Sequence, residues 1–346
     1  MERLILTPEG ERFMVEWGNA LPYVVAHTSG STGAPKEVRL QKTDMIHSAR
    51  ATNRAFGINA DSLLVCPLSA SYIAGKMMIV RAIEAGCRLV MEKPSNHPLR
   101  DDYGMIDLLP IVPAQIPGLL DSQCVQHVRN VIIGGAPLSA RQEQQICDTA
   151  PFRALATYGM TETCSHVALR RLGTSEFTAM PGVSFNVDAR GCLAIISDGG
   201  YSFGRLQTND VVDLLDAHTF IWRGRADNVV ISGGLKLFPE EIEEAVSAAI
   251  SLPPFFIAGR PSDKWGQELV MVIERPDSAT NSNDFPKAIA SKDIRKNPGI
   301  VFKNLTSESL MAILRKILPS VKRPKEIIFV SQILRTSSGK LIRRLS

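Results

Sequence analysis

Short apolar runs alternate with longer helical patterns between about residues 21 and 200. The runs 63–68, 87–91 and 130–133 have the length and apolar character of strands, whereas residues 76–85 have the pattern of a helix. Apolar strands flanked by helices and Gly-rich turns are typical of a largely parallel sheet that is covered on both faces. The pattern therefore predicts an α/β fold with a mostly parallel sheet flanked by helices.

The pattern of the chain changes after about residue 180. Segments 191–196 and 211–218 resemble short strands joined by turns, which predicts a small β-rich subdomain. Further along, a helix that begins at Pro239 and strands at 255–258 and 269–273 predict a small α+β unit. We therefore expect a large domain over residues 1–224, β-rich from about 180, and a small mobile domain over residues 225–346.

Charge and hydropathy exclude several classes of protein. The chain has 39 Lys and Arg against 35 Asp and Glu, and most basic residues alternate with acids, which argues against a nucleic-acid partner. No apolar run approaches the roughly 18 residues of a membrane span, and the first residues lack a signal-peptide pattern. The six cysteines include no C-x-x-C pair. We expect a cytoplasmic protein with buried thiols, no zinc site and no membrane insertion.

A turn rich in Ser, Thr and Gly follows the apolar run 23–26. It reads Thr-Ser-Gly-Ser-Thr-Gly-Ala-Pro-Lys over residues 28–36. Glycines allow close backbone approach and hydroxyls add donors, so such a turn can wrap phosphate oxygens. It is not a Walker A loop, because Pro35 precedes Lys36 and Glu37 follows it. Taken alone, the turn could equally be a plain surface loop.

A second polar turn, residues 157–163, places Glu162 among threonines after another apolar stretch. Mg²⁺ favours one or two carboxylates together with substrate phosphates, so Glu162 is a candidate metal ligand. The structural alternative is an ordinary helix N-terminus with an acidic residue in its first turn.

Six ordered segments together resemble the acyl-adenylate-forming superfamily of acyl-CoA synthetases, peptide-synthetase adenylation domains and luciferases. They span most of the chain, which makes a chance match improbable. The segments are 28–36, 134–138, 158–162, 208–210, 224–227 with 232–234, and 336–340.

The resemblance implies a role in nucleotide binding for several residues. It places Glu162 on Mg²⁺, Thr161 on the α-phosphate, and Asp210 with Arg225 on the ribose hydroxyls. It places glycines and an alanine beside the adenine and acyl pocket, next to Tyr158 and Gly159. The residues implied for the triphosphate are Thr28, Ser29, Gly30, Ser31, Thr32, Gly33 and Lys36, and those for the pocket are Gly134, Gly135 and Ala136.

The resemblance also implies a two-step reaction that uses ATP, Mg²⁺ and CoA. A carboxylic acid attacks the α-phosphate of ATP and releases pyrophosphate, and the thiol of CoA then displaces AMP. The domain over residues 1–224 would bind ATP and the acid. The domain over 225–346 would turn about Asp227 between the steps, withdrawing the adenylation lysine Lys340 and bringing Gly233 and Gly234 beside the pantetheine arm.

Segments 158–166 and 227–243 look most like the o-succinylbenzoate–CoA ligase branch of menaquinone biosynthesis. That acid carries a second carboxylate, which a buried pocket must neutralise or solvate. The candidates for this task are Lys76, Ser165, His166 and Arg170, and Tyr72 is a candidate aromatic gate to the acid pocket. Core or surface roles remain open for each of them. An adenylation enzyme that loads another acid onto CoA or a carrier protein, and a non-catalytic nucleotide-binding protein, also remain open.

The chain departs from the superfamily pattern in three places. Only 27 residues precede Thr28, which implies that an N-terminal subdomain is missing and that a second copy of the chain is a candidate to cover the exposed face. Glu37 and Asn209 stand where relatives usually have glycine.

Overall fold

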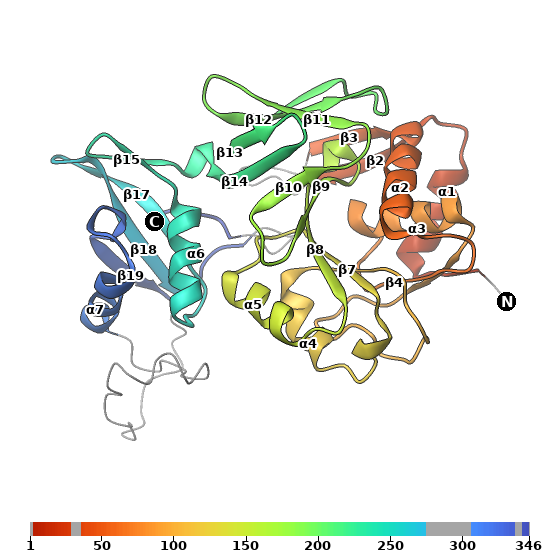
Figure 1. Ribbon diagram of the computed structural model, residues 1–346, viewed down its shortest axis with the longest axis horizontal. Coiled ribbons are helices and arrows are strands. Elements are labelled where there is room, and N and C mark those ends of the chain that lie inside the picture. The colour runs from red at the N-terminus through yellow and green to blue at the C-terminus, as the bar shows by residue number, and fades with distance from the viewer. Residues whose placement is uncertain (1–2, 29–35, 275–305, 336–340, 346) are drawn as a thin grey trace. The chain divides into compact units, whose positions relative to one another are not determined.

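A computed structural model shows the fold (Figure 1) and describes residues 3–28, 36–274, 306–335 and 341–345. The contacts divide the chain into two compact units. The first comprises Met1–Leu138, Gln142–Thr208 and Val212–Trp222, and the second comprises Ser139–Arg141, Asn209–Val211 and Arg223–Ser346. Asn209–Val211 thus belongs to the second unit, although the sequence suggested the first. The functional division at residues 224 and 225 remains a prediction.

The first unit combines helices with three sheets, which confirms the predicted α/β class. Its helices are α1 (Pro8–Gly18), α2 (Lys42–Phe56), α3 (Ile73–Ala85), α4 (Ile116–Leu120) and most of α5 (Ala140–Thr149). Its first eight strands are β1 (Leu4–Ile5), β2 (Tyr23–Thr28), β3 (Lys36–Gln41), β4 (Leu63–Cys66), β5 (Arg88–Met91), β6 (Leu109–Ile111), β7 (Asn130–Ile133) and β8 (Arg153–Gly159).

The strands form parallel and antiparallel regions. A three-stranded sheet, β1-β5-β4, is parallel, and so are β6, β7 and β8 in a nine-stranded sheet of order β11-β12-β13-β14-β10-β9-β8-β7-β6. The pairing becomes antiparallel between β8 and β9, so the β-rich part begins before residue 180. The remaining strands are β9 (His166–Arg171), β10 (Glu176–Ala179), β11 (Val183–Val187), β12 (Cys192–Ser197), β13 (Arg205–Asp216) and β14 (Thr219–Arg225).

Local sequence explains where several elements end. Strand β4 stops at Cys66, short of the predicted residue 68, because Pro67 lacks the N–H that a continuing ladder needs. Helix α3 starts at Ile73, before the predicted residue 76, and ends at Ala85, where Gly86 caps it with a left-handed φ of 65°. Its apolar residues pack with α1, α2 and β5 in one core, whereas β6–β8 share a second core with α4 and α5.

The second unit has the predicted α+β pattern. Its sheet has the order β16-β15-β18-β17, with β19 also pairing with β18, and α6 packs against β17 and α7 (Figure 1). Ile242, Ile257 and Leu310 lie in its core. The elements are β15 (Val230–Ser232), β16 (Leu235–Leu237), α6 (Pro239–Ala249), β17 (Phe255–Ser262), β18 (Gly266–Glu274), α7 (Ser307–Ile317) and β19 (Glu326–Val330).

Two whole-chain expectations can be compared with the structure. Among the described helices, none is long and apolar enough to cross a membrane. The six cysteines are unpaired; four are buried, but Cys124 is only half-buried and Cys147 is exposed. The prediction that all thiols are buried is therefore wrong for these two residues.

Candidate active site

Two predicted motifs meet at one edge of the nine-stranded sheet. Strands β7 and β8 run parallel, and the segments that follow them are Gly134–Ala136 and a short 3₁₀ helix, Thr161–Thr163. The Thr157 hydroxyl donates a hydrogen bond to the Ile133 carbonyl oxygen at 3.2 Å and fixes the two strand ends together. Open α/β sheets bind ligands at the carboxyl ends of their parallel strands.

The glycines at this edge are required by space as well as by backbone conformation. A Cβ on Gly134 would lie 2.3 Å from the Thr157 hydroxyl oxygen, and one on Gly159 would lie 2.3 Å from the Ser165 carbonyl oxygen. Gly135 has a φ of 80°, which disfavours other residues. Gly135 and Ala136 are exposed, whereas the Tyr158 ring packs edge-on against Phe220 with centroids 5.1 Å apart.

Glu162 lies in a turn that its neighbours hold rigidly. The buried Thr163 hydroxyl accepts a hydrogen bond from the Met160 N–H at 3.0 Å and donates one to the Ser165 carbonyl oxygen at 2.7 Å. Cys164 has a φ of 62°, a conformation that is strained for a residue other than glycine. Glu162 itself is half-buried, and its carboxylate has no hydrogen-bond or ion-pair partner among the described residues. It can therefore serve as an oxygen ligand for Mg²⁺.

Strands β2 and β3 bring the ends of the predicted phosphate turn close to this element. They form a two-stranded antiparallel sheet that pairs Thr28 with Lys36, and both strands contact the 3₁₀ helix Thr161–Thr163. The intervening residues Ser29, Gly30, Ser31, Thr32 and Gly33 lie outside the described residues, as does Lys340. The roles predicted for these residues stay predictions.

The second unit brings together the residues predicted for the ribose. The Arg225 guanidinium lies 3.7 Å from the Asp210 carboxylate and 2.8 Å from the Asp227 carboxylate. The Asn209 amide donates to both Asp227 oxygens at 3.3 Å. Asp210 and Arg225 are therefore neighbours, as a shared contact to a ribose requires.

Gly233 and Gly234 form the turn between β15 and β16. Both have positive φ, 56° and 81°, and the flanking residues Ser232 and Leu235 pair directly. Two such residues are typical of a type I′ hairpin turn, which explains the glycine pair in structural terms. The Gly233 N–H donates to the Trp265 carbonyl oxygen at 2.9 Å, so the residue just before β18 supports the turn.

Two of the residues predicted to hold the second carboxylate of the acid already form ion pairs within the protein. Lys76 is buried and ion-paired with Glu16 at 2.9 Å, and Arg170 forms a two-point ion pair with Glu143 at 2.7 and 2.8 Å. Tyr72 is half-exposed at the start of α3. Each of these two side chains already faces a carboxylate, and their predicted roles toward the acid stay predictions.

Sequence reasoning missed Arg81, which lies beside the two remaining candidates. It is only 2% exposed on α3, and its Nη2 donates to the Ser165 hydroxyl oxygen at 2.5 Å. Its Nε has no partner, and no carboxylate of the described residues pairs with it. Burial lowers the pKa of Arg81 to about 10. A single arginine in the apolar run 77–83 was the signal that could have found it.

A chain of hydrogen bonds continues from Arg81 through Ser165 and His166 to Thr52 on α2. Thr52 donates its hydroxyl proton to the Ser48 carbonyl oxygen at 3.0 Å, so it accepts from His166 Nε2 at 3.3 Å. His166 Nδ1 is then the acceptor for the Ser165 hydroxyl at 3.3 Å. Burial and the neighbouring Arg81 lower the pKa of His166 well below its usual value, and the imidazole is neutral.

Comparison with known proteins assigns this arrangement to a family. The family model described as "AMP-binding enzyme" matches residues 12–190, which is more than half of the chain. The chain belongs to the AMP-binding enzyme family. A structure of an acyl-CoA synthetase (AMP-forming)/AMP-acid ligase II-like protein from Dyadobacter fermentans is 31% identical, with a TM-score of 0.59. This match covers 99% of the present chain and 94% of the other.

Two further relatives are more distant. A 2-succinylbenzoate–CoA ligase from Listeria monocytogenes is 24% identical over 94% of this chain and 70% of its own length. An o-succinylbenzoate coenzyme A synthetase from Bacillus subtilis, solved with ATP and magnesium, is 18% identical with a TM-score of 0.73. The match covers 92% of this chain and 68% of that one. The predicted family and enzyme class are confirmed, and these likenesses support the fold.

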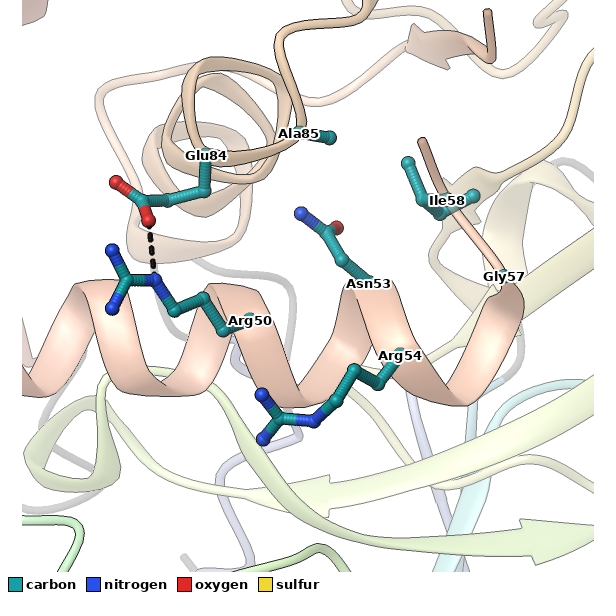
Figure 2. Close-up of a pocket in the computed structure, with 7 residues that line it drawn as sticks. All are labelled: Arg50, Asn53, Arg54, Gly57, Ile58, Glu84 and Ala85. Atoms are coloured by element: carbon teal, nitrogen blue, oxygen red, sulfur yellow. Dashed lines mark hydrogen bonds and ion pairs between the residues drawn. The ribbon is translucent and has the colours of Figure 1, made fainter. Parts of the chain in front are cut away.

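Two other features of this AMP-binding enzyme lie away from the predicted residues. An open hollow of about 340 Å³ lies between α2 and α3, and Figure 2 shows Arg50 and Glu84 paired across it at 2.6 Å while Arg54 points away. Asp102, Cys124 and His127 place possible metal-ligand atoms within 4.8 Å of one another. Sequence analysis overlooked this Cys-x-x-His spacing, although a hydrogen bond between Asp102 and His127 at 3.0 Å accounts for their contact.

Proposed function

We propose that this enzyme is an acid–CoA ligase whose acid is o-succinylbenzoate, activated as an acyl-adenylate. Membership of the AMP-binding family and the ligase relatives make it an acid–thiol ligase that uses ATP, Mg²⁺ and CoA. The observation that supports the finer proposal is the buried guanidinium of Arg81, which lies next to Ser165 and His166 and has no carboxylate partner among the described residues.

Each residue of the site would have a separate role in the first half-reaction, the formation of the acyl-adenylate. Glu162 would hold Mg²⁺, which spreads the negative charge of the phosphates, and Thr161 would contact the α-phosphate on which the acid attacks. Gly134, Gly135 and Ala136, which follow β7, would flank the adenine and the acyl group. Lys340 would donate to the charge that develops in the transition state, while Asp210 and Arg225 would orient the ribose.

The Arg81 guanidinium supplies the positive charge and the N–H donors that the second carboxylate of the acid requires. A guanidinium that is buried without an anion is costly, whereas a bidentate carboxylate would neutralise it and satisfy donors such as Nε. Ser165 already contacts this guanidinium, and the neutral His166 adds no competing positive charge. The site therefore favours an acid with two carboxylates over one with a single carboxylate.

The test is substitution of Arg81 by methionine, which keeps an unbranched apolar stem but removes the charge and the hydrogen-bond donors. We expect KM for o-succinylbenzoate to rise about 10–100-fold, the effect of losing hydrogen bonds to a charged group, with KM for ATP changed less than about twofold. Exposed Arg54→Met on α2 is the matched control and should change neither constant. Equal rises in both constants, or no preference of the wild type for o-succinylbenzoate over monocarboxylic aryl acids, would contradict the proposal.

The second candidate function is an adenylation enzyme that loads another aryl or aliphatic acid onto CoA or a carrier protein. Conversion of free CoA to a thioester distinguishes a CoA ligase from an enzyme that loads a carrier protein, because the carrier-loading enzyme releases little thioester with CoA alone. A cytoplasmic location and a second copy over the N-terminal face stay predictions. Ile5, Val15 and Leu21, near the N-terminus, are exposed apolar residues, which supports the second copy.

A further inference from the structure

The outer edge of strand β2 is completed by two side chains instead of another strand. Among the described strands, β2 pairs only with β3. The Val25 N–H donates to Glu16 Oε1 at 2.7 Å, and the Val25 carbonyl oxygen accepts from Lys76 Nζ at 2.9 Å. Both backbone groups therefore face away from β3, and a carboxylate and an ammonium group satisfy them as a neighbouring strand would.

Glu16 and Lys76 also bind each other and join three elements. Lys76 Nζ on α3 lies 2.9 Å from Glu16 Oε2 on α1, and it lies 5.1 Å from the centre of the Phe13 ring. Lys76 is only 8% exposed, and two of its three N–H donors are used by Glu16 and Val25. The ion pair thus holds β2 against both helices, and its geometry leaves Lys76 little capacity to bind a ligand.

The position of β2 matters because of what lies at its end. The sheet pairs Thr28 with Lys36, which are predicted to line the triphosphate, and both strands contact the 3₁₀ helix that carries Thr161 and Glu162. A shift of β2 would move these ends relative to the candidate Mg²⁺ ligand. Such displacements of about 1 Å are costly in catalysis.

We propose that Glu16 and Lys76 are positioning residues for ATP, which act by holding the edge of β2. This inference rests on the proposed function only in taking ATP as the nucleotide. It replaces the prediction that Lys76 binds the acid, and the two assignments predict opposite effects on the two substrates.

The experiment compares four enzymes by direct binding of a non-hydrolysable ATP analogue and by KM for the acid. Glu16→Gln and Lys76→Met should each raise the Kd for the analogue about tenfold or more, and leave KM for the acid within about twofold. Lys76→Arg keeps donors for both Glu16 and Val25 and should bind the analogue nearly as the wild type does. Melting temperatures identify any variant that simply fails to fold.

A charge swap gives the sharpest test. Glu16→Lys with Lys76→Glu retains an ion pair but turns an ammonium group toward the Val25 N–H and a carboxylate toward its carbonyl oxygen, so analogue binding should stay as weak as in the single variants. The same swap at Arg50 and Glu84, a pair that bridges α2 and α3 (Figure 2), should leave both constants unchanged.

Three results would overturn the inference. They are recovery of analogue binding in the Glu16–Lys76 swap, wild-type analogue binding in every folded variant, and a rise in KM for the acid with unchanged analogue binding. If the wild type makes no adenylate with any acid, the proposed function fails, yet the comparison of analogue binding still tests the roles of Glu16 and Lys76.

Discussion

His166, four residues after Glu162, has a protonation state that is fixed by its burial and its hydrogen bonds. It is buried between Thr52 and Ser165, and its hydrogen bonds require one neutral tautomer with the proton on Nε2. Protonation would place a second positive charge beside Arg81 in a buried region, which explains why the pKa of His166 lies well below its usual value.

The lowered pKa of His166 predicts a pH dependence of stability. Above about pH 6.5 the imidazole is neutral in both the folded and the unfolded protein, so it contributes no pH dependence. Below that pH the unfolded chain binds a proton that the folded protein excludes, and the free energy of unfolding falls by up to about 1.4 kcal/mol per pH unit. His166→Gln should remove this part of the decline. Denaturant titrations at several pH values between about 7 and 5 would measure it, and parallel curves for both proteins would contradict it.

At the scale of elements, the β15–β16 hairpin leads to a prediction about the transfer of the acyl group to CoA. The β15–β16 hairpin places Gly233 and Gly234 at left-handed φ, and a Cβ on Gly234 would meet no atom within 4 Å. Gly234→Ala therefore costs about 1 kcal/mol of backbone strain without a clash. If this turn lies along the pantetheine arm, transfer of a preformed acyl-adenylate to CoA should slow several-fold while ATP–pyrophosphate exchange stays unchanged.

Gly204→Ala is the matched control for the hairpin. Gly204 also has a positive φ, 60°, and a Cβ on it would likewise meet no atom within 4 Å, but it lies before β13. It should leave both half-reactions unchanged. Slowing of both half-reactions by Gly234→Ala, or of neither, would remove the hairpin from the predicted CoA path.

Periodicity and motif spacing predicted the elements that depend on local sequence. The strands at 63–66 and 130–133, the helix that begins at Pro239 and the α+β character of the second unit follow from such patterns. These patterns do not predict which side chains pair with each other in the tertiary structure. Nothing local shows that Lys76 meets Glu16, that Arg170 meets Glu143, or that Arg81 meets no carboxylate in the part of the chain that the structure describes. The ordered motifs that identify the family can therefore be read from the sequence, whereas the partners of charged residues that lie far apart in the sequence cannot. The roles predicted for the site residues stay predictions.

At the scale of the whole molecule, the proposed reaction would need residues of both units. The first unit holds Glu162, Thr161 and Arg81, whereas Asp210, Arg225 and the hairpin glycines belong to the second, which also includes Lys340. A lysine that acts only in adenylation must matter for one half-reaction and not for the other.

The decisive measurement is therefore Lys340→Ala assayed separately in the two half-reactions with o-succinylbenzoate. We expect ATP–pyrophosphate exchange to fall about 100-fold or more, the effect of losing a charge-stabilising donor, while thioester formation from preformed acyl-adenylate and CoA stays within about threefold of the wild type. Equal loss of both half-reactions, or full exchange activity in the variant, would contradict it.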